Sequence, residues 1–224
     1  MISHKKKFIF VHIPKVAGTS IESILFPFAS RFKCANKFAK EYRHLRNYEL
    51  FNSQTSYSNY FSFTFVRNPF DRMVSLYHFF NFDTKISFAE FIEDVKIFLE
   101  QKPEKIYEKV PLNETRLRFR WAHHRHDFQK DIEYNWLDDG NIGYHLLPQM
   151  YFLKNRIDFI GRFEQIKKDL KLVCDRLDIN NLKLPHERKS KHKHYTEYYN
   201  NRLVDLVTQV YSCDISNLGY KFGD

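Results

Sequence analysis

Two stretches of the chain share one order of apolar and polar positions. Residues 8–13 are apolar and rich in β-formers, stop at Pro14, and are followed by Lys15 and by apolar residues at helical spacing over 19–28. Residues 61–66 alternate between aromatic and small polar side chains and lead into Arg67, after which Pro69 opens a second helical pattern. Alternation predicts a strand and a period near 3.6 predicts a helix. Each stretch therefore predicts a strand, a short loop and a helix, with a cation at the turn.

In the rest of the chain, the apolar pattern again predicts both helices and strands. It predicts helices over 87–100, 164–177 and 196–211, a strand over 157–160, a short helix over 45–52, and loop with a short strand over 29–46. Ser87 and Glu90 have the spacing of a capping box. Residues 102–145 show no regular pattern. Alternating strands and helices predict an α/β fold, a single domain over 1–224 with a central parallel sheet flanked by helices.

The two turns carry candidate chemistry. N–H groups at the start of a helix lack intrahelical partners and bind anions, and Lys15 adds a mobile cation. The lysine precedes the glycine of this stretch, unlike the Gly-x-x-x-x-Gly-Lys-Ser/Thr loop, so the spacing disfavours an ordinary kinase or ATPase. In the second turn, the Arg67 guanidinium and the Ser75 hydroxyl suit a phosphate monoester. Alternatively, Arg67 pairs with Asp71 at the start of the helix and Ser75 only packs.

Composition narrows the partners and the compartment. A net charge of +9 indicates an anionic partner, such as a nucleotide, a glycan, a membrane surface or nucleic acid, or else serves solubility alone. Three widely spaced cysteines argue against a disulfide framework and a thiolate zinc site, and favour the cytoplasm. The apolar run after the basic N-terminus is too short for a signal peptide or a membrane span.

Together, the two motifs resemble sulfotransferases that use 3′-phosphoadenosine-5′-phosphosulfate (PAPS). The nearest likeness is to the carbohydrate sulfotransferase group, which includes the heparan 2-O-, chondroitin and HNK-1 enzymes and small bacterial relatives. Four segments carry the resemblance in the family's order: His12–Ser20, Phe65–Tyr77, Ile157–Glu164 and Tyr211–Tyr220. The resemblance implies a P-loop-like sulfotransferase fold and the transfer of a sulfuryl group from PAPS to a carbohydrate hydroxyl.

The resemblance also assigns roles to single residues. Lys15 and the residues after it would hold the 5′-phosphosulfate, Arg67 and Ser75 would hold the 3′-phosphate, and the basic stretch 188–193 would close over the nucleotide. A charge run of this kind is otherwise a solvated face. The implied cofactor contacts are Lys15, Val16, Ala17, Gly18, Thr19, Ser20, Arg67, Ser75, Ser190 and Lys193.

Sulfuryl transfer, like phosphoryl transfer, needs positioning and charge stabilisation. Lys15 would neutralise the leaving phosphate, and the scheme requires no metal. Histidine is the usual group that accepts a proton at neutral pH. By resemblance the base is His44, and His145 is a substrate-side residue or a second candidate for the base. Glu164 is expected to be structural, with its charge facing the dipole of the helix that follows it.

A histidine- and arginine-rich stretch lies in the irregular region. His123, His124 and His126 invite a metal site, but neighbouring histidines on a regular element point to different sides. We therefore expect an acceptor-binding surface for an anionic glycan or glycolipid, and neither a metal nor a nucleic-acid partner. Its basic residues are Arg116, Arg118, Arg120 and Arg125, of which Arg120 is the substrate-binding candidate. Two alternatives stay open, a polyanion-binding module without catalysis and a nucleotide kinase-like P-loop enzyme.

Overall fold

The computed structural model describes residues 1–29, 57, 59–79, 86–100, 145–153, 157–180 and 192–224. A four-stranded sheet runs through this part of the chain in the order β1 (Ile2–Ser3), β2 (Phe8–Val11), β3 (Phe61–Val66) and β4 (Phe159–Arg162). The pairs β2–β3 and β3–β4 are parallel, and β1 is antiparallel to β2. The predicted parallel sheet is confirmed, and β1 is an addition that its two-residue length hid from the hydrophobic pattern.

The central strands are buried on both faces, as continuous apolar runs in parallel sheets usually are. Phe63 stacks on Phe10 across the β2–β3 pair, with ring centroids 5.2 Å apart, and also contacts Phe8. The small polar positions of β3 are buried as well, because each has a partner: Thr64 Oγ1 donates to the Val11 carbonyl at 2.7 Å. The alternation of aromatic and small polar residues in β3 therefore reflects hydrogen bonding rather than a solvent-facing side.

The strand β4 begins two residues later than its sequence predicts. Asp158 donates its backbone N–H to the Ser62 carbonyl, and its carboxylate accepts from the Ser62 N–H and hydroxyl at 2.9 Å. This side-chain pairing takes the place of the first ladder bonds. At the other end, Gly161 lies against Phe65, since a Cβ there would come within 2.5 Å of the ring.

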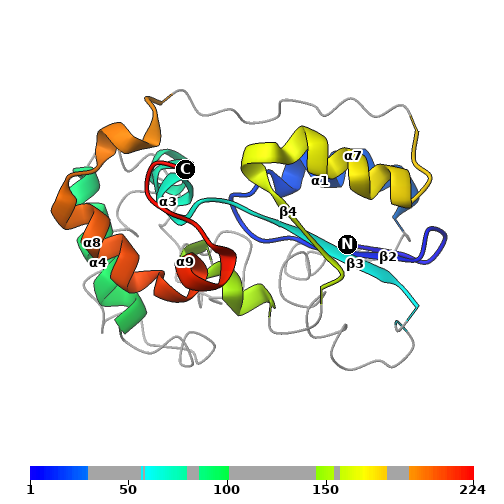
Figure 1. Ribbon diagram of the computed structural model, residues 1–224, viewed down its shortest axis with the longest axis horizontal. Coiled ribbons are helices and arrows are strands. Elements are labelled where there is room, and N and C mark those ends of the chain that lie inside the picture. The colour runs from blue at the N-terminus through cyan, green and yellow to red at the C-terminus, as the bar shows by residue number, and fades with distance from the viewer. Residues whose placement is uncertain (30–56, 58, 80–85, 101–144, 154–156, 181–191) are drawn as a thin grey trace, which may run out of the picture.

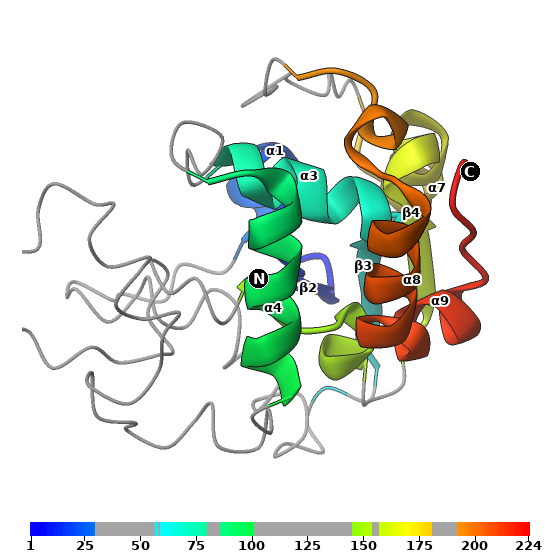
Figure 2. The ribbon, with the colours of Figure 1, turned by 90° about the vertical axis from the view of Figure 1, so that its left-hand side faces the viewer.

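Six α-helices are described: α1 (Gly18–Leu25), α3 (Pro69–Phe79), α4 (Phe88–Glu100), α7 (Ile166–Arg176), α8 (Asn201–Val210) and α9 (Ser212–Leu218). Short 3₁₀ turns are η1 (Phe26–Phe28), η7 (Gln149–Leu153), η8 (Phe163–Gln165) and η9 (Tyr195–Tyr198). The helices α1 and α7 lie on one side of the sheet, and α3, α4 and α8 gather beyond the carboxyl ends of the strands (Figures 1 and 2). Within the described helices, none has the length and apolar character that a bilayer span needs.

Side-chain caps fix several helix ends. The predicted capping box of α4 is present, with Ser87 Oγ accepting from the Glu90 N–H and Glu90 Oε2 accepting from the Ser87 N–H. The predicted single helix over 196–211 is wrong. Asn200 caps a new helix by accepting from the Leu203 N–H at 3.0 Å, so the segment divides into η9 and α8. A strong N-cap residue within an apolar pattern of continuous helical period is the physical reason for the break.

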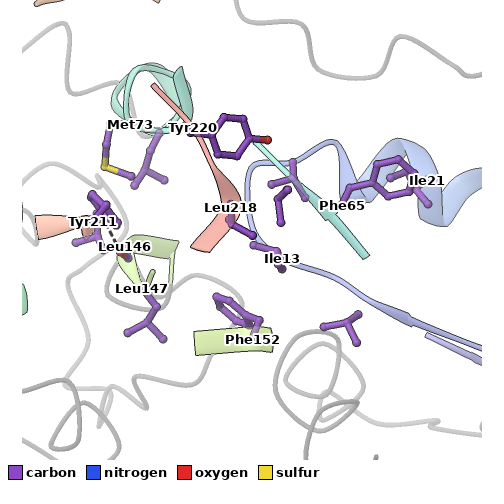
Figure 3. Packing of buried hydrophobic residues seen from close by; sticks show 14 of the residues in the cluster. Ile13, Ile21, Phe65, Met73, Leu146, Leu147, Phe152, Tyr211, Leu218 and Tyr220 are labelled. Carbon is purple, nitrogen blue, oxygen red and sulfur yellow. Dashed lines mark hydrogen bonds between the residues drawn. The ribbon is translucent and has the colours of Figure 1, made fainter. Parts of the chain in front are cut away.

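Segments that lie far apart in the chain share one core (Figure 3). Its labelled side chains include Ile13 after β2, Phe65 on β3, Met73 on α3, Leu146, and Tyr211 near the C-terminus. The Tyr211 hydroxyl donates to the Leu146 carbonyl at 2.7 Å, and burial raises the pKa of this phenol. The core therefore joins both predicted motifs to residues 145–153 and to the C-terminal part of the chain.

Candidate active site

The two predicted cations lie together at one edge of the sheet. Lys15 comes four residues after β2, and Arg67 comes directly after β3, the neighbouring parallel strand. Arg67 Nη1 donates to the Lys15 carbonyl at 3.2 Å. The loop after β2 and the end of β3 are therefore in direct contact at the carboxyl edge, where ligands bind in open α/β sheets.

The loop after β2 has an unusual backbone conformation. Lys15 and Ala17 have φ angles of 71° and 63°, in the left-handed region that residues with a side chain rarely occupy. Within the described residues, the N–H groups of Ala17, Gly18, Thr19 and Ser20 donate to no other group, and α1 begins with the bond from Ile21 N–H to the Ala17 carbonyl. Left-handed residues next to a helix N-terminus turn successive amides toward one point and form an anion-binding nest.

Gly18 is required by space rather than by its φ angle. A Cβ at this position would lie 2.0 Å from His12 Nε2, so the imidazole occupies the volume of a side chain. His12 is buried, stacks on Phe10, and places its Nδ1 3.0 Å from Glu22 Oε1 on α1. The His12 ring therefore ties the end of β2 to the first turns of α1.

The Lys15 ammonium lies over an aromatic ring that the sequence did not single out. Its Nζ is 3.7 Å from the centroid of Phe79, the last residue of α3, which is a cation–π contact. The Phe79 ring in turn stacks on His145, with centroids 6.1 Å apart and planes at 29°. The structure thus brings His145, predicted from the resemblance, to within one ring of Lys15. The sequence signal for Phe79 was the aromatic end of the second helical pattern.

Arg67 forms the pair with Asp71 that the sequence analysis gave as the alternative to phosphate binding. Its Nε donates to Asp71 Oδ2 at 2.7 Å, and its guanidinium carbon lies 4.1 Å from the centroid of Phe163. Its Nη2 makes no hydrogen bond with any described residue, and neither does the hydroxyl of Ser75, a mostly buried residue two turns along α3. One edge of the guanidinium is therefore held by the protein while donor capacity is left over.

A second arginine in this helix is completely buried. Arg72 donates from Nε to the Pro14 carbonyl at 3.2 Å and from Nη2 to the carbonyls of His145 and Leu147 at 2.9 and 2.8 Å. Charge-assisted hydrogen bonds of this kind are stronger than neutral ones. Arg72 therefore connects the loop after β2 to the segment that carries His145, a role that the sequence analysis missed.

Gln149 and Asp214 hold the backbone at and near Arg67 through hydrogen bonds. Gln149 Oε1 accepts from the Arg67 N–H, and Gln149 Nε2 donates to the Arg67 carbonyl, both at 2.8 Å. Asp214 accepts from the N–H groups of Gln149 and Met150 at 2.7 and 2.9 Å. Burial raises the pKa of the Asp214 carboxyl, while the charge of Arg72 acts in the opposite direction.

Glu164 is structural, but its partner differs from the expected one. Its Oε1 accepts from the Asn68 N–H at 2.7 Å and its Oε2 accepts from the Tyr220 hydroxyl at 3.0 Å. The carboxylate therefore faces the start of α3, not the start of the helix that follows it in the sequence. Asn68 also donates to the Lys221 carbonyl, so the C-terminal segment packs on the end of β3.

Several predicted residues lie outside the described part of the chain: His44, Arg120 and Ser190, and with them His123, His124, His126, Arg116, Arg118 and Arg125. Among the described residues, no three His, Cys, Asp or Glu side chains gather as a metal site requires.

The predicted cofactor residue Lys193 lies near α3. Its neighbour His192 stacks on His78 of that helix, with centroids 5.1 Å apart, and Lys193 Nζ is 3.9 Å from a Glu197 carboxylate oxygen. An open hollow is lined by His192, Lys193, Glu197 and Tyr198. No contact among the described residues joins Lys193 to Lys15 or Arg67, so its role as a cofactor contact stays a prediction.

Comparison with known families shows which family the chain belongs to. A model of the sulfotransferase family matches residues 1–221 of the chain. The chain belongs to the sulfotransferase family. Neither the curated proteins nor the solved structures gave a match. The protein is therefore a transferase of sulfuryl groups with the predicted α/β sulfotransferase fold. Membership in this family argues against the nucleotide-kinase and the non-catalytic alternatives.

Proposed function

We propose that this sulfotransferase moves the sulfuryl group of PAPS to a hydroxyl of a carbohydrate acceptor. The observation that carries the proposal is the contact between the two cationic motifs, Arg67 Nη1 to the Lys15 carbonyl at 3.2 Å. PAPS carries a phosphosulfate at its 5′ end and a phosphate at its 3′ end. The unbonded amides of residues 17–20 with Lys15 suit the first group, and Arg67 Nη2 with the Ser75 hydroxyl suits the second.

In the proposed reaction the residues act mainly by position and charge. The loop amides hold the oxygens of the transferred group, and loss of one such donor typically costs about 10²–10³ in rate. The Lys15 ammonium neutralises the charge that grows on the bridging oxygen as the bond to sulfur breaks. Charge stabilisation by the lysine and the amides is sufficient for this chemistry, so the proposal assigns no metal.

A base must take the proton of the acceptor hydroxyl. We assign this role to His44, with His145 as the second candidate because its ring lies against Phe79, which contacts Lys15. The acceptor proposal, an anionic glycan or glycolipid, rests on the resemblance to carbohydrate sulfotransferases and on the net charge of +9. The cytoplasmic location belongs to the same proposal and is supported by the free thiols of Cys174 and Cys213.

Calorimetric titration with 3′-phosphoadenosine-5′-phosphate tests the cofactor site. Lys15→Ala and Arg67→Ala should each weaken binding by about tenfold to a hundredfold, because each removes charge-assisted hydrogen bonds. Lys5→Ala and Arg202→Ala are matched controls, since Lys5 lies in the β1–β2 turn and Arg202 pairs with Glu93 on the surface. Unchanged affinity in both site variants would reject the proposed cofactor site.

Transfer of labelled sulfate from PAPS to a panel of glycans tests the acceptor and the base. His44→Ala should bind nucleotide normally and lose turnover, whereas an active variant would move the base to His145. Tyrosine peptides and small hydroxylated metabolites belong in the same panel as competing acceptor classes. Release of bound polyanion by salt, without any nucleotide affinity, would instead favour a basic binding module.

A further inference from the structure

Residues 145–150 lie against the second cationic motif and are held by buried side chains. Arg72 donates to the carbonyls of His145 and Leu147, and the Tyr211 hydroxyl donates to the carbonyl of Leu146. Asp214 accepts from the backbone N–H groups of Gln149 and Met150. The backbone of this segment is therefore fixed by partners from α3 and from the C-terminal part of the chain.

From this fixed segment, the Gln149 side chain reaches the backbone of Arg67. Its carboxamide accepts from the Arg67 N–H and donates to the Arg67 carbonyl, both at 2.8 Å, and the residue is completely buried. Arg67 is the first residue beyond the end of β3. The amide thus supplies both of the hydrogen bonds that a neighbouring strand would otherwise give to this residue.

The contacts form a closed ring. Arg67 Nη1 bonds to the Lys15 carbonyl, and the Pro14 carbonyl accepts from Arg72 at 3.2 Å. Arg72 holds the segment 145–147, and Gln149, at the end of that segment, returns to the backbone of Arg67. Since each link is a hydrogen bond from a mostly or fully buried group, breaking one leaves a polar group unpaired, which is costly.

We propose that Gln149 is a positioning residue that sets Arg67 against the loop after β2, and so fixes the spacing of the two anion-binding motifs. This inference rests on the proposed function, in which both motifs hold one nucleotide. The carboxamide acts on the Arg67 backbone, from which the guanidinium extends to Asp71, Phe163 and the Lys15 carbonyl. Gln149 itself does not contact the reacting groups.

An isosteric substitution tests the donor half of this pairing. In Gln149→Glu, an ionised carboxylate would face the Arg67 carbonyl without a proton to donate, whereas the protonated acid restores both bonds. The charged groups around this side chain are Asp214, whose Oδ2 is 3.4 Å from Gln149 Nε2, and Arg72, which donates to the carbonyls of His145 and Leu147 in the same segment. Burial and the nearby Asp214 carboxylate should raise the pKa of the introduced carboxyl. The variant should therefore bind 3′-phosphoadenosine-5′-phosphate about tenfold more weakly than wild type where this carboxyl is ionised, and its affinity relative to wild type should recover as the pH falls through that pKa.

Two further variants complete the design. Gln149→Leu removes both hydrogen bonds at similar size and should weaken nucleotide binding by about tenfold at every pH. Gln209→Glu is the matched control, because it makes the same chemical change on the exposed side of α8 and should follow wild type throughout. Normal binding by Gln149→Leu, or normal binding by Gln149→Glu at high pH where its carboxyl is ionised, would overturn the inference.

Amide hydrogen exchange at Arg67 gives a readout without any ligand. Its N–H should be protected in wild type and should exchange at least about tenfold faster in Gln149→Leu. If wild-type protein binds no nucleotide, the proposed function fails. The exchange rate still reports on the hydrogen bond from the Arg67 N–H to Gln149. If nucleotide binds and Arg67→Ala abolishes it while Gln149→Leu changes neither binding nor exchange, the positioning role alone is rejected.

Discussion

Individual side chains show how much the chemistry of one position depends on its surroundings. Cys174 and Cys213 are both free thiols, but Cys174 is buried on α7 and Cys213 is exposed on α9. Burial, with a smaller contribution from Asp175, raises the pKa of Cys174 to about 11. Since the thiolate is the reactive form, the two residues should differ strongly toward the same reagent.

A thiol titration measures this difference. In protein with Cys34→Ser, the exposed Cys213 should give the fast phase. Near pH 8, Cys174 should react about a hundredfold more slowly than a cysteine with the ordinary thiol pKa, because its thiolate fraction is lower by that factor. The rate for Cys174 should rise with pH up to about 11. Cys213→Ser leaves the slow phase alone as a control, and a fast single phase in that variant would contradict the burial of Cys174.

Residue-level prediction from sequence succeeded where chemistry and local order coincide. The pattern placed Lys15 and Arg67 at the turns that follow two apolar strands, and the structure joins these turns at one edge of the sheet. Phe79, Arg72 and Gln149 carried no such signal. Their partners lie far along the chain, 82 residues away in the case of Gln149 and Arg67, and no local period encodes a hydrogen bond of that range.

At the scale of elements, the loop between β2 and α1 contains a strained backbone position, Ala17, followed by a glycine, Gly18. Ala17 is held at a φ angle of 63°, for which a residue with a Cβ pays about 1–2 kcal/mol. Gly18, in contrast, has no Cβ because His12 fills that space. The glycine therefore stands one residue after the position whose backbone conformation would favour it.

Substitution at Ala17 tests the strain. Ala17→Gly should leave the free energy of unfolding unchanged or raise it by up to about 1 kcal/mol, since relief of the left-handed strain exceeds or offsets the greater entropy of the unfolded chain. The matched control is Ala29→Gly, where φ is −64° and a loss of about 0.4–1 kcal/mol is expected. Urea denaturation provides both values, and equal losses at the two positions would refute the strain.

Gly18 provides the complementary experiment. Gly18→Ala should destabilise the protein by about 1–3 kcal/mol, because the new methyl group overlaps the His12 ring. In the background of His12→Ala, the same substitution should cost much less, since the ring is gone. A double-mutant cycle by thermal or urea unfolding measures the coupling, and additive effects would show that the overlap is relieved elsewhere.

Element boundaries show where sequence reading is weakest. The strand β3 and the capping box of α4 were predicted correctly, because aromatic alternation and a Ser-x-x-Glu pattern are strong local signals. The helix over 196–211 was wrong because the apolar pattern runs across the break at Asn200. The hydrogen bond of an N-cap decided a boundary that hydrophobic spacing could not.

For the whole molecule, ligand binding should stabilise the native state through both motifs. With free 3′-phosphoadenosine-5′-phosphate at about a hundred times its Kd, the free energy of unfolding should rise by about 2.7 kcal/mol. At the same nucleotide concentration, Arg67→Ala should lose about 1.3–2.3 kcal/mol of this gain, as its tenfold to hundredfold weaker binding requires, whereas Arg202→Ala should retain it. Differential scanning calorimetry with and without nucleotide measures the effect, and an equal shift in both variants would place the ligand elsewhere.

The ring of contacts through Gln149 has a consequence for the order in which the molecule matures. Its members come from the first tenth of the chain, from residues 67–72, from 145–149 and, through Asp214, from the last dozen residues. A chain still emerging from the ribosome can form β2 and β3 early, but the gap between its two cations is not yet set. Nucleotide affinity should therefore be one of the last properties that the newly made protein acquires.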